Sequence, residues 1–183
     1  MPIEEWKRKC MELEKQEAEQ TADLKAKYRE LEIEACLERV RAKTMAMHKS
    51  SEIREVASTM YTELRKLDFQ YGACTIILMM ENSMDMEWWI GGFEEGEFPQ
   101  AYRISFFEHP VYRNIWEGWK HEENFRVIQL KGKSKKSFDQ ELFFHNGFKD
   151  LTESVKAWML AQTSVIFSLA YMKHGALHWG PDP

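Results

Sequence analysis

A glycine–lysine–serine triplet at Gly132–Ser134 is the part of the sequence that comes closest to a nucleotide-binding motif. A phosphate-binding loop needs a further glycine five positions before Gly132, and Val127 stands there instead. The triplet therefore lacks the glycine-rich backbone that wraps around phosphate oxygens. The lysines around it are interpreted as a solvated loop: Lys131, Lys133, Lys135 and Lys136.

The histidines and cysteines are not spaced as metal ligands or nucleophiles. No HxxxH or HExxH pair lies on one helix face among His48, His109, His121, His145, His174 and His178. Cys74 lies in an apolar segment, where burial raises the pKa of a thiol and makes it inert. The sequence also lacks a GxSxG nucleophile elbow. We therefore expect a protein that is not an enzyme, and no cofactor is indicated. A metal or carboxylate site assembled from distant residues stays open.

Aromatic residues are dense between Trp88 and Phe125, and this density is the main sign of a binding site. Adjacent side chains of a strand point to opposite faces, so Trp88 and Trp89 serve different faces of a sheet. If the segments 106–120 and 138–151 cover one face, an apolar pocket can form beneath them. The alternative is that the aromatic side chains only fill a core. The candidate ligand-binding residues are Trp88, Tyr102, Arg103, Phe106, Trp116 and His145.

Residues 1–49 predict one long helix, because they contain no glycine, no proline after Pro2, and many good helix formers. A seam with the alternating three- and four-residue spacing of a coiled coil runs along it: Ile3, Trp6, Cys10, Leu13, Leu24, Tyr28, Leu31 and Ala35. Glu17 and Gln20 interrupt this seam, which then resumes displaced by four residues. Such a stutter locally unwinds a coiled coil without ending it. We therefore expect a homodimer formed through this helix.

A second apolar stripe begins near the end of the same helix, at Ile33, Leu37, Val40, Thr44 and Met47. A helix with two stripes needs a partner helix and a further surface, for which its own globular domain is the natural choice. The alternative, a single helix lying on its own domain, stays open. The sequence does not decide between parallel and antiparallel pairing.

Residues 50–183 predict a single α+β domain with a central antiparallel sheet of about five to six strands and flanking helices. The segment 48–52 breaks the long helix, with Ser50 or Ser51 as the cap of a second helix that ends near Asp68. Apolar periodicity then changes to two. The expected strands are 71–80, 86–93, 101–107, 125–130, 163–172 and 176–179, and the further helices begin at Pro110 and cover 138–151.

The segment Leu37–Ser50, followed by Glu52, Ile53, Val56 and Ala57, resembles the helix that leads into GAF-like sensor domains of bacterial, especially Bacteroidetes-type, signalling proteins. Similar landmarks follow at Asp68-Phe69, Trp88–Gly91 and the hairpin around His174-Gly175. The resemblance implies a non-catalytic sensor near a histidine kinase, LytTR-type or cyclase output module, as in two-component systems. It implies no particular binding residues. Family members usually continue into a last helix, whereas this chain stops at Pro183.

The composition excludes several classes of function. The chain has 183 residues, of which 44% are hydrophobic and 13% aromatic, so it can bury a core. Its net charge of −5 argues against binding to nucleic acid or to an anionic membrane. Three scattered cysteines and a charged, non-apolar start predict a cytoplasmic protein. We expect a sensor that binds an unidentified small molecule and relays the signal through the dimerising helix. The alternative is a dimerisation or protein-interaction module without a ligand.

Overall fold

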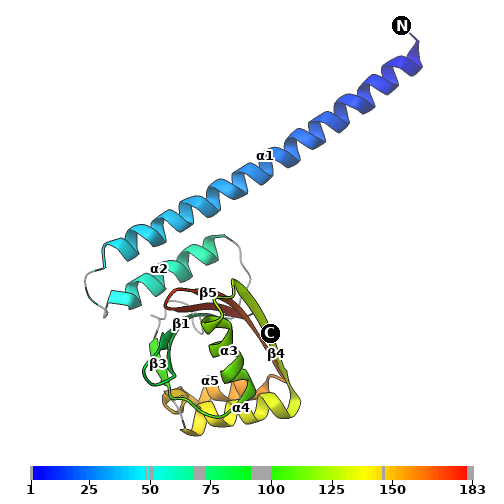
Figure 1. Cartoon of the computed structure of the whole chain (residues 1–183). Helices are drawn as coiled ribbons and strands as arrows, with labels where there is room; N and C mark the ends of the chain where they lie inside the picture. Colours follow the sequence, from blue (N-terminus) through cyan, green and yellow to red (C-terminus); the bar gives the residue numbers. More distant parts are fainter. Residues whose placement is uncertain are drawn as a thin grey trace. The chain divides into compact units, whose positions relative to one another are not determined.

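The chain forms two compact units, Met1–Ala46 and Met47–Pro183, in a computed structural model (Figure 1). The described residues are 2–47, 49, 52–67, 73–91, 100–145 and 147–180. The expected helix cap at Ser50 or Ser51 lies outside the described residues, as do Asp68-Phe69 and the start of the strand expected from Tyr71.

The first unit is a single helix, α1 (Ile3–Met45), of 43 residues. Pro2 is its N-cap residue, and Glu4 and Glu5 occupy the first turn, where carboxylates favour the positive end of the helix dipole. The helix continues without a break through Glu17 and Gln20, which confirms the long helix expected from the composition.

The second unit is built on a six-stranded antiparallel sheet with the strand order β3-β2-β1-β6-β5-β4. Its strands are β1 (Ala73–Met80), β2 (Asp85–Gly91), β3 (Gln100–Ile104), β4 (Phe125–Lys131), β5 (Ser164–Met172) and β6 (Gly175–Gly180). β1 lies inside the sheet, between β2 and β6. Its position explains why its residues are apolar on both faces. The α+β class and the strand number expected from the sequence are confirmed.

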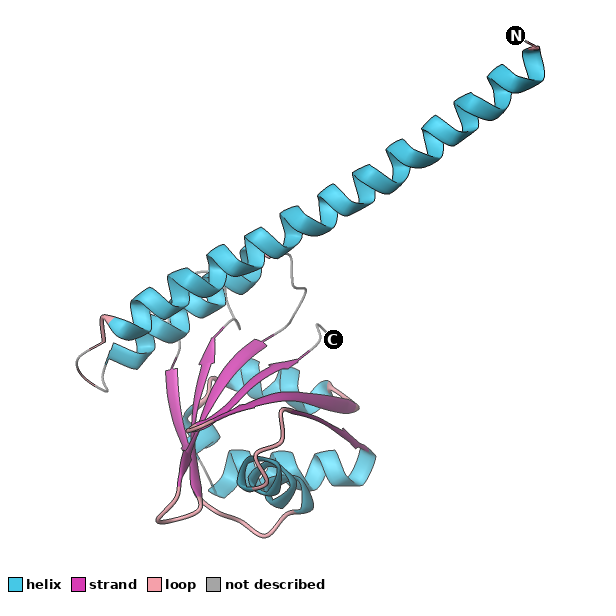
Figure 2. Ribbon diagram, turned by 45° about the horizontal axis from the view of Figure 1, so that its top comes forward, coloured by secondary structure: helices cyan, strands magenta, loops and turns pink. Residues whose placement is uncertain are grey.

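Helices cover both faces of this sheet (Figure 2). On one face, α2 (Ile53–Lys66) packs its residue Ala57 against Ile76 of β1 and Trp89 of β2. The opposite face carries α3 (Pro110–Lys120), α4 (Gly132–His145), the 3-10 turn η2 (Gly147–Asp150) and α5 (Glu153–Ala161). This second layer encloses the larger core, which includes Ile77, Trp88, Tyr112, Phe138, Leu142, Phe148, Phe167 and Leu169.

The two adjacent tryptophans of β2 belong to different layers. Trp88 packs in the larger core, and Trp89 packs beneath α2. The expectation that strand alternation separates them is confirmed.

The lysine run was predicted to be a solvated loop. Lys131, Lys133 and Lys136 are exposed as expected, but the segment is not a loop and Lys135 is buried. β4 ends at Lys131, and α4 begins at the next residue, Gly132, whose φ of 54° permits the abrupt change of direction. Lys135 is buried inside this helix and donates hydrogen bonds to Asp139 and to the carbonyl oxygen of Met159. The buried carboxylate of Asp139 compensates the buried charge of Lys135. A run of lysines in the sequence does not indicate such a buried pair.

The boundaries of two other helices also differ from expectation. The helix expected over 138–151 is divided, because α4 ends at His145 and η2 begins at Gly147. α5 was not expected at all. Thr152 caps it by accepting a hydrogen bond from the backbone N–H of Val155, and all its residues are at least partly exposed, so it lacks the apolar stripe of a buried helix.

His178 gives the second unit a pH-dependent stability. Burial lowers the pKa of this side chain to about 4, while its Nδ1 donates to the carbonyl oxygen of Ser168 at 3.3 Å. In the unfolded chain a histidine titrates near 6.5, so the unfolded state takes up a proton first as the pH falls. The contribution of His178 is therefore complete above pH 6.5 and is lost as the pH falls towards 4.

The gap between these two pKa values corresponds to about 3 kcal/mol of unfolding free energy. We expect urea titrations between about pH 7 and pH 4 to show a correspondingly steeper loss for the wild type than for His178→Gln, which cannot titrate. His174→Gln, at an exposed position nearby, should keep the wild-type slope. Equal slopes for His178→Gln and wild type would contradict the prediction.

Candidate functional site

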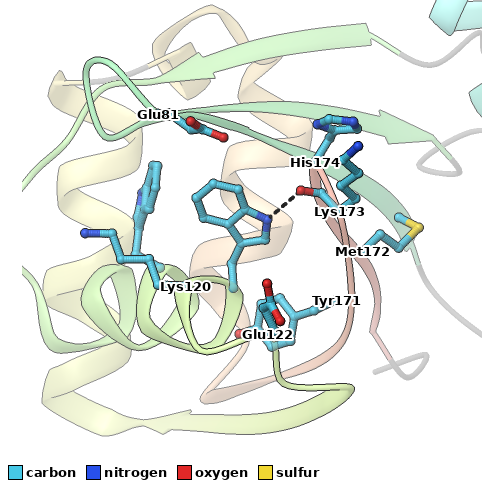
Figure 3. A pocket seen from close by; sticks show the side chains of 9 residues that line it. Glu81, Lys120, Glu122, Tyr171, Met172, Lys173 and His174 are labelled. Carbon is cyan, nitrogen blue, oxygen red and sulfur yellow. Dashed lines mark hydrogen bonds between the residues drawn. The ribbon is translucent and has the colours of Figure 1, made fainter.

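A pocket of about 830 Å³ lies at the C-terminal end of α3, within the second unit (Figure 3). The last turn of α3, the hairpin between β5 and β6 and the turn after β1 form its walls. Its volume lies in the range of small-molecule sites, roughly 300–1,000 Å³. The lining residues are Glu81, Trp116, Trp119, Lys120, Glu122, Tyr171, Met172, Lys173 and His174.

Two tryptophans of α3 form an aromatic corner in this pocket. The rings of Trp116 and Trp119 are nearly perpendicular, at 84°, with their centroids 5.2 Å apart. Nε1 of Trp119 donates a hydrogen bond of 3.3 Å to the carbonyl oxygen of Lys173, drawn as the dashed line in Figure 3. This bond holds the tip of the β5–β6 hairpin against the end of α3.

Gly118 allows Tyr171 to lie directly on α3. A Cβ atom at Gly118 would stand 2.3 Å from the hydroxyl oxygen of Tyr171, so any larger residue would displace the ring. Burial raises the pKa of Tyr171 to about 12, so the phenol is neutral at physiological pH. Tyr171 thus adds a third aromatic wall with a neutral hydroxyl group.

Two buried polar groups of the pocket lining make no hydrogen bond within the described part of the chain. They are Nε1 of Trp116, whose side chain is almost fully buried, and the hydroxyl oxygen of Tyr171. Buried N–H and O–H groups of folded proteins nearly always have a partner, because leaving one unpaired costs about 1–3 kcal/mol. Both atoms have almost no accessible surface, so they are enclosed by the protein and do not face the interior of the pocket.

The backbone is unusual at both turns that border the pocket. Among the described residues, Met84 and Glu122 are the two non-glycine residues with positive φ, at 58° and 53°. Met84 ends the turn that contains Glu81, and Glu122 follows α3. Left-handed conformations at non-glycine residues are uncommon and concentrate at functional turns.

Of the six candidate residues from the sequence, Trp88 and Tyr102 lie together in the larger core. Both rings pack edge-on against Phe148, at centroid distances of 5.7 and 5.3 Å, and Trp88 also contacts Phe167. The space above this part of β2, where a ligand was expected, holds the side chain of Phe148.

Arg103 and Phe106 lie elsewhere. Arg103 donates to Asp85 through Nε at 3.0 Å and Nη2 at 2.7 Å, and Asp85 also accepts from the backbone N–H of Phe106. Burial alone would raise the pKa of Asp85, but these hydrogen bonds lower it. The ring of Phe106 packs against Tyr112 at 5.4 Å. Both residues thus hold the end of β3 in place.

Trp116 is the one member of the candidate set that lines the pocket, and the side chain of His145 lies outside the described residues. The structure does not gather the other described candidates around Trp116. The pocket instead uses residues that the sequence did not single out, chiefly Tyr171, Glu81 and Glu122. The i, i+3 spacing of Trp116 and Trp119 was the available signal, because it places both rings on one side of a helix.

Within the described ranges, no group of three or more His, Cys, Asp and Glu side chains is arranged to hold a metal ion. Burial raises the pKa of the Cys74 thiol to about 12, as expected for a cysteine inside an apolar strand. No helix in the described part of the chain is both long enough and apolar enough to cross a membrane.

Comparisons with known proteins give no relative. No family model, no curated protein and no solved structure matches the chain.

Proposed function

We propose that this chain is a cytoplasmic, non-catalytic regulatory module: a GAF-like sensor domain whose N-terminal helix pairs with a second copy. The domain binds a small molecule and relays its presence through the paired helices to a kinase, cyclase or transcriptional output module. The resemblance of Leu37–Ala57 to GAF-like proteins and the antiparallel sheet with helices on both faces support the domain assignment. The exposed seam of α1 carries the functional proposal.

Six large apolar side chains of this seam are between 55% and 75% exposed: Ile3, Trp6, Leu13, Leu24, Tyr28 and Leu31. Their three- and four-residue spacing places them along one face of α1. A continuous apolar stripe of this length is characteristic of an interaction surface. A second copy of α1 presents an identical stripe, so two copies bury both.

The charges that flank the seam favour a parallel, in-register pair. In the heptad notation abcdefg, the seam consists of positions a and d. In a parallel pair, position g of one copy, which directly precedes an a position, faces position e of the other copy, five residues later. Lys9 then faces Glu14, Lys27 faces Glu32, and Glu34 faces Arg39, and all three contacts join opposite charges. An antiparallel pair that matches Cys10 with Leu24 places Lys9 opposite Lys27 instead, which is a repulsive contact.

Sedimentation and thiol cross-linking of the whole chain test this proposal. We expect a dimer with twice the 21.8 kDa mass of one chain. Cys10 is exposed and belongs to the seam, whereas Cys36 and Cys74 are buried. In a parallel, in-register pair the two Cys10 thiols face each other, so a short bis-maleimide should link the copies. Cys10→Ser should abolish the link. A monomer would contradict dimerisation, and a dimer without the Cys10 link would contradict the parallel register.

One observation favours the second candidate, a dimerisation module without a ligand. The core over Trp88 is filled by Phe148, Phe138 and Phe167, so a ligand has no room at the place where GAF-like domains were expected to bind one. The two candidates make the same prediction for α1 and differ only in whether the pocket beside α3 takes a ligand.

A further inference from the structure

The sheet of the second unit has two edge strands, β3 and β4, and their outer sides differ. β3 has five residues, and η2 lies so close to it that a Cβ atom at Gly147 would stand 2.6 Å from the carbonyl oxygen of Arg103. β4 has seven residues and pairs with β5 alone (Figure 1). In the described part of the chain, no other backbone group hydrogen-bonds to residues 125–131. The outward N–H and C=O groups of β4 can therefore pair with a further strand.

β4 also lacks most of the features that keep edge strands from pairing. Such features include a proline, a bulge, a very short length or an inward-pointing charge. β4 contains neither proline nor glycine, and its register with β5 advances by one residue at each step without a bulge. Two of its apolar side chains, Phe125 and Val127, are 50% and 56% exposed. A long, regular edge with exposed apolar side chains is typical of a strand that associates with another strand.

The sequence of β4 complements itself in one antiparallel register. A two-fold axis at Val127, perpendicular to the sheet, places Val127 of one copy opposite Val127 of the other. Phe125 then lies opposite Gln129, on the same exposed face of the strand. Lys131 lies opposite Glu123, so opposite charges meet at both ends of the contact.

The neighbouring registers fit less well. An axis at Arg126 places two arginines opposite each other, which is a repulsive contact. An axis at Ile128 places Phe125 opposite Lys131 and Val127 opposite Gln129, so each exposed apolar side chain faces a polar one. The register centred on Val127 is therefore favoured.

We propose that β4 is a second interface between copies of this chain, in which the β4 strands of two copies pair antiparallel about Val127 and join their sheets. This inference rests on the proposed pairing of α1 and adds a contact to it. In a parallel pair the two sheets follow the same end of the paired helices, so the strands meet at a high effective concentration. One strand from each copy buries less than the ~800 Å² per partner of a stable complex, so the contact depends on α1.

Thiol cross-linking at position 127 of the whole chain tests this contact. Val127→Cys is combined with Cys10→Ser, so that position 127 carries the exposed thiol while Cys36 and Cys74 stay buried. Directly opposite residues of an antiparallel pair have Cβ atoms about 4.5–5.5 Å apart. We therefore expect dibromobimane, a short reagent that joins two thiols, to link the two copies.

Gln129→Cys in the same Cys10→Ser background is the matched control. Gln129 is exposed and lies on the same face of the same strand as Val127. In the proposed register the two copies of position 129 are four residues apart along the strand direction, or roughly 14 Å. The short reagent should therefore leave this variant unlinked.

A charge reversal tests the ends of the contact. Lys131→Glu places a carboxylate opposite Glu123 and should lower the linked fraction of Val127→Cys several-fold. Lys133→Glu makes the same change at an exposed position of α4, beyond the strand, and should leave the linked fraction unchanged.

The outcomes separate this inference from the proposed function. A chain that sediments as a dimer but shows no link at position 127 would overturn the β4 contact and leave the pairing of α1 in place. Equal linking at positions 127 and 129 would overturn the register. A chain that sediments as a monomer would overturn the proposed pairing of α1 itself.

Discussion

Leu13→Asp should dissociate the proposed dimer, whereas Met11→Asp, two residues earlier, should leave it intact. Both residues are exposed apolar side chains of α1, with 57% and 68% of their surface accessible. Leu13 belongs to the seam, while Met11 lies beside it, one position after Cys10. Both substitutions replace a long apolar side chain by aspartate within one turn of the helix, so their effects on helix propensity are similar.

The expected size of the effect follows from the area that pairing removes from water. Burying one leucine contributes about 1.5–3 kcal/mol, and each dimer contains two copies of Leu13. Aspartate also brings two like charges together. We therefore expect the dissociation constant from sedimentation equilibrium to rise by ~100-fold or more for Leu13→Asp, and by less than about threefold for Met11→Asp. Similar dissociation constants for the two variants would show that the seam is not the interface.

The stutter at Glu17 and Gln20 gives the helix its proposed role in signalling. In the proposed dimer, two polar residues in the seam would weaken one layer of the coiled coil, and we expect two packings of similar energy there. A ligand that favours one packing shifts the balance between them only by its difference in affinity for the two. The proposal therefore requires that ligand binding and the packing of this layer be coupled.

Much of the fold was predictable because local patterns determine it. α1 follows from a long run of good helix formers, and β1 follows from a segment that is apolar on both faces and so belongs inside a sheet. The start of α3 was also accessible, because Pro110 stands at its first turn and His109 accepts a hydrogen bond from the backbone N–H of Val111. These signals act within a few residues of the chain.

The pocket was not predictable, because tertiary packing assembles it. Tyr171 reaches α3 only because Gly118, more than fifty positions earlier, has no side chain to displace it. Glu81 comes from a turn on a different hairpin. Likewise, Phe148 occupies the space above Trp88 because it lies on η2. The sequence had predicted one unbroken helix over 138–151 and therefore did not indicate this turn. No pattern in a single sequence links positions so far apart.

The buried lysine of this run contributes to stability in a way that can be measured. Lys135 and Asp139 are each about 95% buried, and the ammonium group also donates to the carbonyl oxygen of Met159 at 2.7 Å, which joins α4 to α5. Burial raises the pKa of Asp139, and the hydrogen bond from Lys135 opposes this change. Each charge of the pair is therefore stabilised by the other, because neither is solvated by water.

Lys135→Met should lower the free energy of unfolding by about 3–5 kcal/mol at neutral pH, since it leaves the carboxylate of Asp139 buried without its partner. The double variant Lys135→Met/Asp139→Leu should recover most of this loss, because it removes both charges. Lys136→Met makes the same substitution at an exposed neighbour and should change stability by less than about 0.5 kcal/mol. Chemical denaturation of the four proteins measures these differences.

The pH dependence of Lys135→Met gives the same argument a second test. Without Lys135, the folded-state pKa of Asp139 should rise further above its unfolded value, since burial then acts unopposed. A carboxyl group with a raised folded pKa stabilises the fold when protonated, and this stability is lost as the pH rises through that pKa. Lys135→Met should therefore be least destabilising in acid and most destabilising at neutral pH, and the double variant should lack this trend. If the single variant were equally destabilised at both pH values, the loss would come from packing and not from the unpaired charge.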